Sequence, residues 1–231
     1  MTPELFTPLR LRGVELRNRI VVSPMCQYSA VEGVVQDWHL EHHARFALGG
    51  CGAAFVEATG VTRDGRITHG CTGLWEDGQI AGLARIASMY RGHGVAPGIQ
   101  LVHAGRRASQ ARPWEGNKPL ALGGPDPAWQ TVGPSAVPER EGYPVPHVLT
   151  AAEIGEVVEA FRAATLRARQ AGFELVEIHG AHGYLLHSFF SPIPNRREDE
   201  FGGSLERRMR VPLMVAEAVR AAWPAELPLD P

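Results

Sequence analysis

The sequence predicts an α/β protein in which repeated strand–helix units build a parallel sheet. Two observations support this. Short apolar runs alternate with stretches of helical periodicity, and the runs are apolar along their whole length. Strands that are apolar on both faces are typical of parallel sheets, whose two faces are covered. Such units form either a doubly wound sheet or a (β/α) barrel.

The first part of the chain predicts a hairpin followed by alternating strands and helices. The hairpin spans residues 5–19, with Gly13 in its turn. The elements after it are expected in the order strand 20–23, helix 39–48, strand 53–58, helix 80–91 and strand 98–102. Glycines follow both helices, which favours C-terminal caps at these points.

A polar segment rich in proline and glycine, residues 104–148, interrupts the alternation. It is too long for a bare connection, so we interpret it as a lid or binding loop. Thr150 and Glu153 then form a capping box that begins the next helix. A strand over 174–178 follows this helix.

The last predicted helix begins near Ser204, and Pro212 in its middle predicts a kink. We expect its core face to carry Met209, Leu213, Ala216 and Val219.

The junction between the first strand and the first helix separates the two sheet arrangements. A doubly wound dinucleotide-binding fold carries a glycine-rich fingerprint there, whereas this chain has SPMCQYSAVEG at residues 23–33. The barrel is therefore favoured. A complete barrel needs eight strands and only four are evident, so either the chain holds half a barrel or strands are miscounted.

The composition is that of a globular domain, with 231 residues, 44% hydrophobic and 21% charged residues, and a net charge of −2. Because no basic leader and no apolar segment of about 18 residues is present, we expect no membrane, no nucleic acid and a cytoplasmic location. The cysteines, Cys26, Cys51 and Cys71, are odd in number and lack metal spacing. Reduced thiols are therefore favoured over disulfides.

Polar side chains gather directly behind the strand at 174–178. The block EIHGAHGYLLHSFFSPIPNRREDEFGGSLERR places His179, His182 and Tyr184 there, and reactive groups collect at the carboxyl ends of parallel strands. The two histidines could also ligate zinc, which leaves a metal-dependent hydrolase as an alternative. A catalytic zinc ion usually takes three protein ligands, and no third is evident.

Two other polar clusters are weaker candidates for function. His39, His42 and His43 have a spacing that a metal could use, but no strand end positions them and a structural role is favoured. Arg106 and Arg107 follow the strand at 98–102 and suit a nicotinamide cofactor, an anionic substrate or a solvated surface equally well.

Four separated segments resemble the Old Yellow Enzyme family. They are NRIVVSPMCQYSA (18–30), VEATGVTRDGRIT (56–68), GIQLVHAGRRA (98–108) and HGAHGYLLHSFFSP (179–192). Within this family, the cysteine in SPMC makes the chain similar to the branch of bacterial ene-reductases called thermophilic-like. The resemblance implies a TIM barrel that binds FMN, takes hydride from NADPH or NADH and reduces the C=C bond of a small enone-type substrate. It leaves room for assembly into a homo-oligomer.

The resemblance also assigns residues to FMN. Cys26 is expected near the edge of the ring system, where a thiol tunes the reduction potential, and Gln100 is expected to hydrogen-bond the pyrimidine edge. Ala58 is small enough for a close approach of the ring. The complete set expected to contact FMN is Ser23, Pro24, Met25, Cys26, Ala58 and Gln100.

For the substrate, the resemblance implies that His179 and His182 bind the carbonyl oxygen and stabilise the charge that develops on it. Tyr184 is expected to donate the proton. Tyr28 is expected to line the substrate pocket.

The resemblance places residues 1–231 in the N-terminal part of a single FMN-binding barrel domain. Members of the family are longer, so we expect the C-terminal half to be absent, together with the phosphate site that barrels build after strands seven and eight. A fifth strand is expected to begin at 228–231. The alternative to an active enzyme is a catalytically silent half-barrel fragment.

Overall fold

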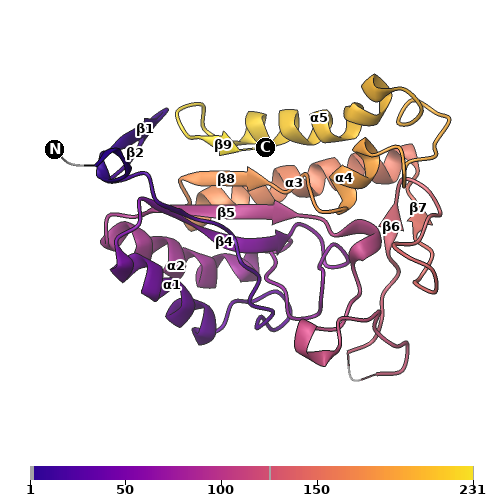
Figure 1. The fold of residues 1–231 in the computed structure, drawn as a ribbon, viewed down its shortest axis with the longest axis horizontal. Coiled ribbons are helices and arrows are strands. Elements are labelled where there is room, and N and C mark those ends of the chain that lie inside the picture. The colour runs from indigo at the N-terminus through magenta and orange to yellow at the C-terminus, as the bar shows by residue number, and fades with distance from the viewer. Residues whose placement is uncertain (1–2, 125, 231) are drawn as a thin grey trace.

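The computed structural model describes residues 3–124 and 126–230, and its main sheet has five strands in the order β3-β4-β5-β8-β9 (Figure 1). All neighbouring strands are parallel, so their carboxyl ends lie at one edge. The strands are β3 (Val21–Val22), β4 (Ala53–Gly60), β5 (Ala96–Val102), β8 (Leu175–Ile178) and β9 (Leu229–Asp230). The short β9 confirms the expected beginning of a fifth strand.

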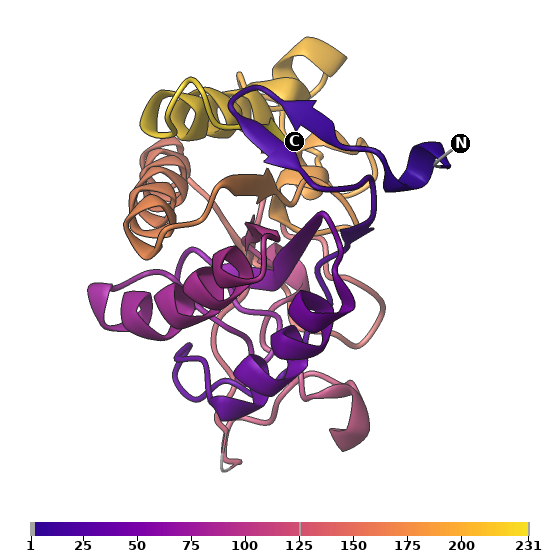
Figure 2. The ribbon, with the colours of Figure 1, turned by 90° about the vertical axis from the view of Figure 1, so that its left-hand side faces the viewer.

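The long helices form an arc around the outside of the curved sheet (Figure 2). They are α1 (Asp37–Gly49), α2 (Ile80–Gly92), α3 (Ala151–Ala171) and α5 (Leu205–Ala222). Strands and long helices alternate along the chain, which confirms the predicted α/β class. Within the described residues, no helix is long and apolar enough to cross a bilayer.

The helix ends follow the caps that the sequence predicts. Gly50 and Gly172 adopt left-handed φ angles of 73° and 87° after α1 and α3, a conformation that glycine takes without steric cost. At the start of α3, Thr150 Oγ1 accepts the Glu153 N–H at 3.2 Å and a Glu153 carboxylate oxygen accepts the Thr150 N–H at 2.7 Å. The capping box is confirmed.

The main core lies between the sheet and the helices. Its fully buried side chains include Leu83 and Ile86 of α2, Ile99 of β5, Phe161 of α3 and Val215 of α5. Burial of such side chains is the dominant stabilising contribution, roughly 1.5–3 kcal/mol for each.

The predicted N-terminal hairpin is present as β1 (Leu9–Leu11) and β2 (Val14–Leu16), which pair antiparallel, and it follows a 3-10 turn, η1 (Glu4–Phe6). The Gly13 N–H donates to the Glu226 carbonyl at 2.7 Å. The hairpin therefore contacts the segment that leads into β9. Phe55 of β4 joins Leu16 in a second apolar cluster at this end of the sheet.

The segment 104–148 contains short elements of its own. They are η3 (Gly105–Arg107), η4 (Pro113–Glu115), β6 (Val132–Gly133) and β7 (His147–Val148). Arg106 Nη1 donates to the carbonyls of Val137 and Pro138 at 3.3 and 3.0 Å. The segment is thereby anchored to the end of β5. A further 3-10 turn, η2 (Asp77–Gln79), precedes α2.

The predicted core face of α5 is partly wrong. Leu213 is 49% exposed, and the buried stripe consists of Val211, Val215 and Val219. Residues spaced by four lie on one helical face, so these three valines form a single buried stripe. Met209 lies on a different face of the helix and lines a cavity beside β8. Pro212 lies inside a continuous helix.

One helix was not predicted. The chain after β8 forms α4 (Leu185–Phe190), with Tyr184 as its N-cap residue. Leu185, Leu186 and Phe189 are buried in the main core. A helix of this length is not stable by itself, so tertiary packing stabilises α4.

Candidate active site

A cavity of about 440 Å³ opens at the carboxyl ends of the strands. It is lined by all the predicted site residues except Met25 and Tyr28, namely Ser23, Pro24, Cys26, Ala58, Gln100, His179, His182 and Tyr184. They come from the segment after β3, from β4, from β5 and from the turn after β8. Residues far apart in sequence meet here because parallel strands end at one edge.

Met25 and Tyr28 lie beside this cavity rather than in its lining. The Met25 side chain is 43% exposed, and its carbonyl accepts a hydrogen bond from Gln27 Nε2 at 2.7 Å. The Tyr28 ring packs edge-to-face on Trp114, with 6.1 Å between ring centroids. Tyr28 has a left-handed φ of 51°.

The imidazoles of His179 and His182 and the phenol of Tyr184 form one aromatic group. The centroid of the His179 ring lies 5.0 Å from that of His182 and 4.7 Å from that of Tyr184, and all three rings meet nearly at right angles. His182 adopts a left-handed φ of 56°, a backbone conformation that costs a residue with a Cβ about 1 kcal/mol or more.

Hydrogen bonds define which nitrogen of each ring carries a proton. His179 Nδ1 accepts the Ala181 N–H at 3.2 Å, so the proton of neutral His179 lies on Nε2. That nitrogen is 3.3 Å from His182 Nδ1, which can accept it. The N–H of neutral His182 then lies on Nε2. Burial, together with the neighbouring His182, lowers the pKa of His179 to about 4.

Tyr184 is held by the turn that begins α4. Its N–H donates to the Ala181 carbonyl at 3.1 Å, and its carbonyl accepts the Ser188 N–H at 2.7 Å. His187 Nδ1 accepts the Gly183 N–H at 2.8 Å. Burial raises the pKa of the Tyr184 phenol to about 12, and nearby Arg107 opposes that rise.

Gln100 and Glu177 form the polar part of the cavity wall. They are register neighbours on β5 and β8, and Gln100 Nε2 donates to Glu177 Oε1 at 2.5 Å. Glu177 was not predicted as a site residue. An acidic residue inside the apolar strand 175–178 is the signal that could have identified it, because a carboxylate in a buried strand needs a polar partner.

A buried carboxylate supports the segment that carries Cys26. Glu57 is fully buried, and its Oε2 accepts the Gln27 N–H at 3.0 Å. Its Oε1 lies 3.3 Å from His39 Nε2, and His39 Nδ1 accepts the Gln36 N–H at 3.0 Å. Burial raises the pKa of Glu57, and the contact with His39 lowers it.

The histidines of α1 thus have structural contacts. His39 binds Glu57, and the buried His43 Nδ1 lies 2.6 Å from the Tyr90 hydroxyl. Within the described ranges, no cluster of three or more His, Cys, Asp or Glu side chains has the geometry to hold a metal ion. The zinc alternative therefore lacks a third protein ligand beside His179 and His182 in the part of the chain that the structure describes.

The side chains that line the cavity fit the ring system of a flavin. Pro24, Phe55 and Ala58 provide an apolar wall, and the Gln100 amide offers both a donor and an acceptor. Burial raises the pKa of Cys26 well above its usual value, and Cys71 and Glu57 add to the rise, so Cys26 lies there as a neutral thiol. No lysine or arginine is among the described residues that line the cavity, so these residues fit the ring and not a phosphate group.

Comparisons with known proteins identify the family of the chain. A family model described as NADH:flavin oxidoreductase / NADH oxidase matches residues 4–227. The chain is 46% identical to an NADH:flavin oxidoreductase from Gibberella zeae, over 98% of this chain and 55% of that protein. It is 42% identical to an NADPH dehydrogenase from Geobacillus thermodenitrificans, over 98% of this chain and 62% of that protein. The chain therefore spans less than two thirds of the length of these relatives.

Solved structures give the same result. Morphinone reductase superposes with a TM-score of 0.84 at 30% identity, over 99% of this chain and 61% of that one. An Old Yellow Enzyme from Pichia sp. AKU4542 superposes with a TM-score of 0.85 at 27% identity, over 98% of this chain and 58% of that one. The predicted partial TIM-barrel fold and the predicted resemblance to Old Yellow Enzymes are both confirmed. The chain belongs to the NADH:flavin oxidoreductase / NADH oxidase family.

Proposed function

We propose that this chain carries the substrate side of the active site of an FMN-dependent NAD(P)H oxidoreductase that reduces the C=C bond of α,β-unsaturated carbonyl compounds. The observation that carries this proposal is the meeting of His179, His182 and Tyr184 in one cavity with Cys26 and Gln100. Family membership supports a flavin, and the names of the relatives, which include both NADH and NADPH, support a reduced nicotinamide cofactor as the hydride donor. The activity of the whole protein is likewise proposed, because this chain spans only part of the length of its relatives.

Five side chains would hold the flavin ring. We assign the pyrimidine edge to Gln100 and the apolar face to Pro24 and Ala58, with Ser23 and Cys26 beside the ring. When bound, FMN supplies the hydride that reduces the alkene. Glu177 accepts the Gln100 Nε2–H at 2.5 Å and so orients the amide for that contact.

The two histidines would bind the carbonyl oxygen of the substrate. Because the pKa of His179 is about 4, the ring is neutral near pH 7 and donates one N–H from Nε2. In the absence of substrate this N–H faces His182 Nδ1, so the substrate oxygen competes with His182 for it. N–H donors aimed at an oxygen that gains negative charge stabilise the transition state more than the ground state.

Tyr184 would donate the proton that completes the reduction. With a pKa of about 12, its hydroxyl stays protonated near neutral pH and is available as a general acid. The α-carbon is strongly basic once hydride has arrived at the β-carbon, so a weak acid is sufficient. The proton leaves Tyr184 Oη and forms a C–H bond at the α-carbon.

Replacement of Tyr184 by Phe tests the proposal. We expect the oxidative half-reaction with an enone to slow by about 100-fold or more, because general acid catalysis is lost. Reduction of the bound flavin by NADPH should be unchanged. Anaerobic stopped-flow absorbance of the flavin measures both rates. An equal loss in both half-reactions contradicts the assignment.

Tyr143→Phe is a matched control. Tyr143 lies in the segment 104–148, stacks on Arg140 at 4.8 Å and does not line the cavity. The substitution removes a phenol hydroxyl without changing the proposed proton donor. Both half-reactions should therefore retain the rates of the unsubstituted protein.

The second candidate is a chain that does not bind FMN by itself. The cavity lining favours it in one respect, since none of the described lining residues carries a positive charge for the phosphate. Equilibrium titration of purified protein with FMN, followed by flavin absorbance and fluorescence, separates the two candidates. Stoichiometric binding excludes the silent fragment, and absence of binding contradicts the oxidoreductase for this chain.

A further inference from the structure

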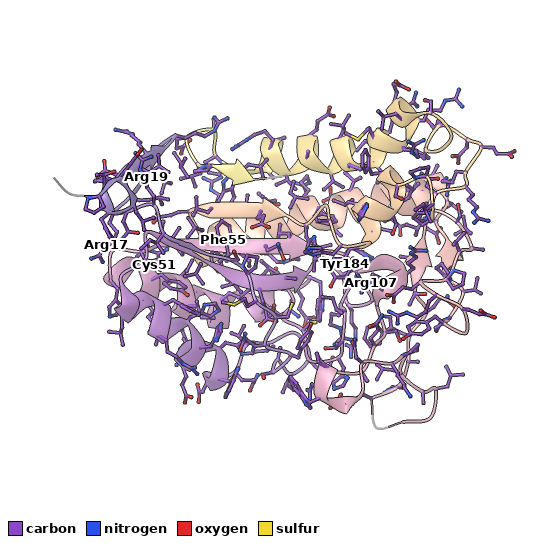
Figure 3. All side chains as sticks on the ribbon, viewed as in Figure 1. Arg17, Arg19, Cys51, Phe55, Arg107 and Tyr184 are labelled. Carbon is purple, nitrogen blue, oxygen red and sulfur yellow. The ribbon has the colours of Figure 1, made fainter. Side chains whose placement is uncertain are left out.

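Arg107 lies against the proposed proton donor although it does not line the cavity. Its Cζ is 5.5 Å from the centroid of the Tyr184 ring, and its Nη1 donates to the His182 carbonyl. Figure 3 shows the two labelled side chains close together at the carboxyl edge of the sheet. One guanidinium thus contacts two members of the His179-His182-Tyr184 group.

Glu139, further along the same segment 104–148, contacts Arg107 from its other side. Arg107 Nε lies 3.1 Å from Glu139 Oε1, and the Glu139 side chain is only 10% exposed. The other oxygen of Glu139 accepts a hydrogen bond from Gln110 Nε2 at 2.9 Å. The guanidinium is therefore fixed between Glu139 and the turn after β8.

We propose that Arg107 stabilises the phenolate that Tyr184 becomes when it gives up its proton, and that Glu139 holds Arg107 in the position to do so. This inference rests on the proposed role of Tyr184 as proton donor. Arg107 acts through Tyr184 and is a positioning residue, since it lies against the Tyr184 ring and does not line the cavity.

The charge balance of the step explains the need for a cation. The O–H bond of Tyr184 breaks, the proton joins the electron pair on the α-carbon, and the O–H pair stays on the phenol oxygen. A full negative charge then lies on a side chain that is only partly exposed to water. A positive charge within about 4–6 Å of an acidic group stabilises its ionised form and lowers its pKa by about 1–3 units.

Several titratable and charged groups face Tyr184 from the surrounding elements. Among them, Arg107 lowers the pKa of the phenol, whereas Cys26, Cys71 and Glu139 raise it. Arg107 therefore opposes both burial and these neighbours. The groups that contact or influence the ring are Cys26, Tyr28, Cys71, Arg107, Glu139, His179 and His182.

The kinetic test compares Arg107→Leu with Arg140→Leu in the FMN-loaded protein. Arg140 is the matched control because it also pairs with Glu139, at 3.1 Å, but its side chain is 61% exposed and stacks on Tyr143 instead. We expect Arg107→Leu to slow enone reduction by about 10-fold or more, which corresponds to a rise of about one unit in the pKa of the Tyr184 phenol. Arg140→Leu should stay within about 3-fold, and Arg107→Lys, which keeps the charge, should recover most of the rate.

A second measurement reads the phenol itself without catalysis. 3-Nitrotyrosine incorporated at position 184 ionises in the neutral range and changes colour as it does so. In the flavin-free full chain, Arg107→Leu should move its titration midpoint up by about 1 pH unit, and Arg140→Leu should not. An unchanged midpoint, or equal shifts in both variants, overturns the proposal.

The two measurements also separate this inference from the proposed function. If the protein reduces no enone while the midpoint still moves, the proposed function fails and the contact between Arg107 and the phenol stands. If enones are reduced and Arg107→Leu has neither effect, the role of Arg107 fails alone.

Discussion

At the scale of single residues, a backbone N–H decides how His179 can work. The Ala181 N–H occupies Nδ1, so the proton of the neutral ring lies on Nε2, on the side of His182. Burial keeps the ring neutral, with a pKa of about 4. The same burial makes the folded state sensitive to acid.

We expect the free energy of unfolding to fall as the pH drops from about 6.5 to about 4. His179 in the unfolded chain binds a proton near pH 6.5, whereas in the folded protein it does so only near pH 4. Between these values the unfolded state holds more protons, so stability rises with pH and is lost on acidification. A difference of about 2.5 pKa units corresponds to a contribution on the order of 3 kcal/mol.

Urea unfolding at several pH values, with and without His179→Asn, measures this contribution. The variant should lose part of the acid dependence. His43, with a pKa of about 3, should account for some of what remains. An identical pH slope in the two proteins contradicts the prediction.

At the scale of elements, the Glu57–His39 pair joins three pieces of the chain. Glu57 belongs to β4 and His39 to α1, and the Gln27 N–H that Glu57 accepts belongs to the segment carrying Cys26. The strand shifts its register against β5 between Val56 and Ala58, which is where Glu57 lies. A bulge of this kind redirects side chains at the edge of a site. Here Glu57 contacts His39 of α1, whereas the next residue, Ala58, lines the candidate site.

We expect His39→Ala to destabilise the protein by about 3 kcal/mol or more, because it leaves a buried carboxylate without its partner. His42→Ala is the matched control, since His42 lies on the same helix and is only partly buried. It should cost less than about 1 kcal/mol. Urea denaturation of both variants provides the comparison, and equal losses would show that the pair is not special.

At the scale of the whole molecule, Phe55 connects the two ends of the sheet. It lines the candidate site and also a cavity of about 400 Å³ at the opposite end, where the hairpin residues Leu11 and Leu16 contribute. In Figure 3 its label lies between Tyr184 and the group of Arg17 and Cys51. The hairpin is thus packed on the strand that carries Ala58.

Phe55→Ala should lower the free energy of unfolding by about 3 kcal/mol, the usual cost of deleting a buried aromatic ring. Amide hydrogen exchange in β1 and β2 should become faster, because the hairpin loses its contact with β4. Phe6→Ala, at a position 54% exposed, should change stability by no more than about 0.5 kcal/mol. Unchanged exchange in the hairpin would disprove the connection.

The sequence was most informative where one local rule determines the outcome. Caps at Gly50 and Thr150 and the apolar strands of the sheet follow from local chemistry, and they were predicted. The face of α5 was not, because Leu213 and Val215 lie on competing apolar stripes and only packing against α3 and α4 selects between them. The Arg107–Glu139 contact joins residues 32 positions apart in a segment without strong periodicity, so no sequence pattern announces it.

The left-handed backbone at His182, with its φ of 56°, sets stability against function at one position. Glycine would relieve about 1 kcal/mol of steric cost there, but it would remove the imidazole that we assign to the carbonyl oxygen. Selection for heat resistance alone therefore favours glycine at 182, whereas selection for turnover keeps histidine. Engineering for both properties requires stabilising changes elsewhere in the chain, with residue 182 left as it is.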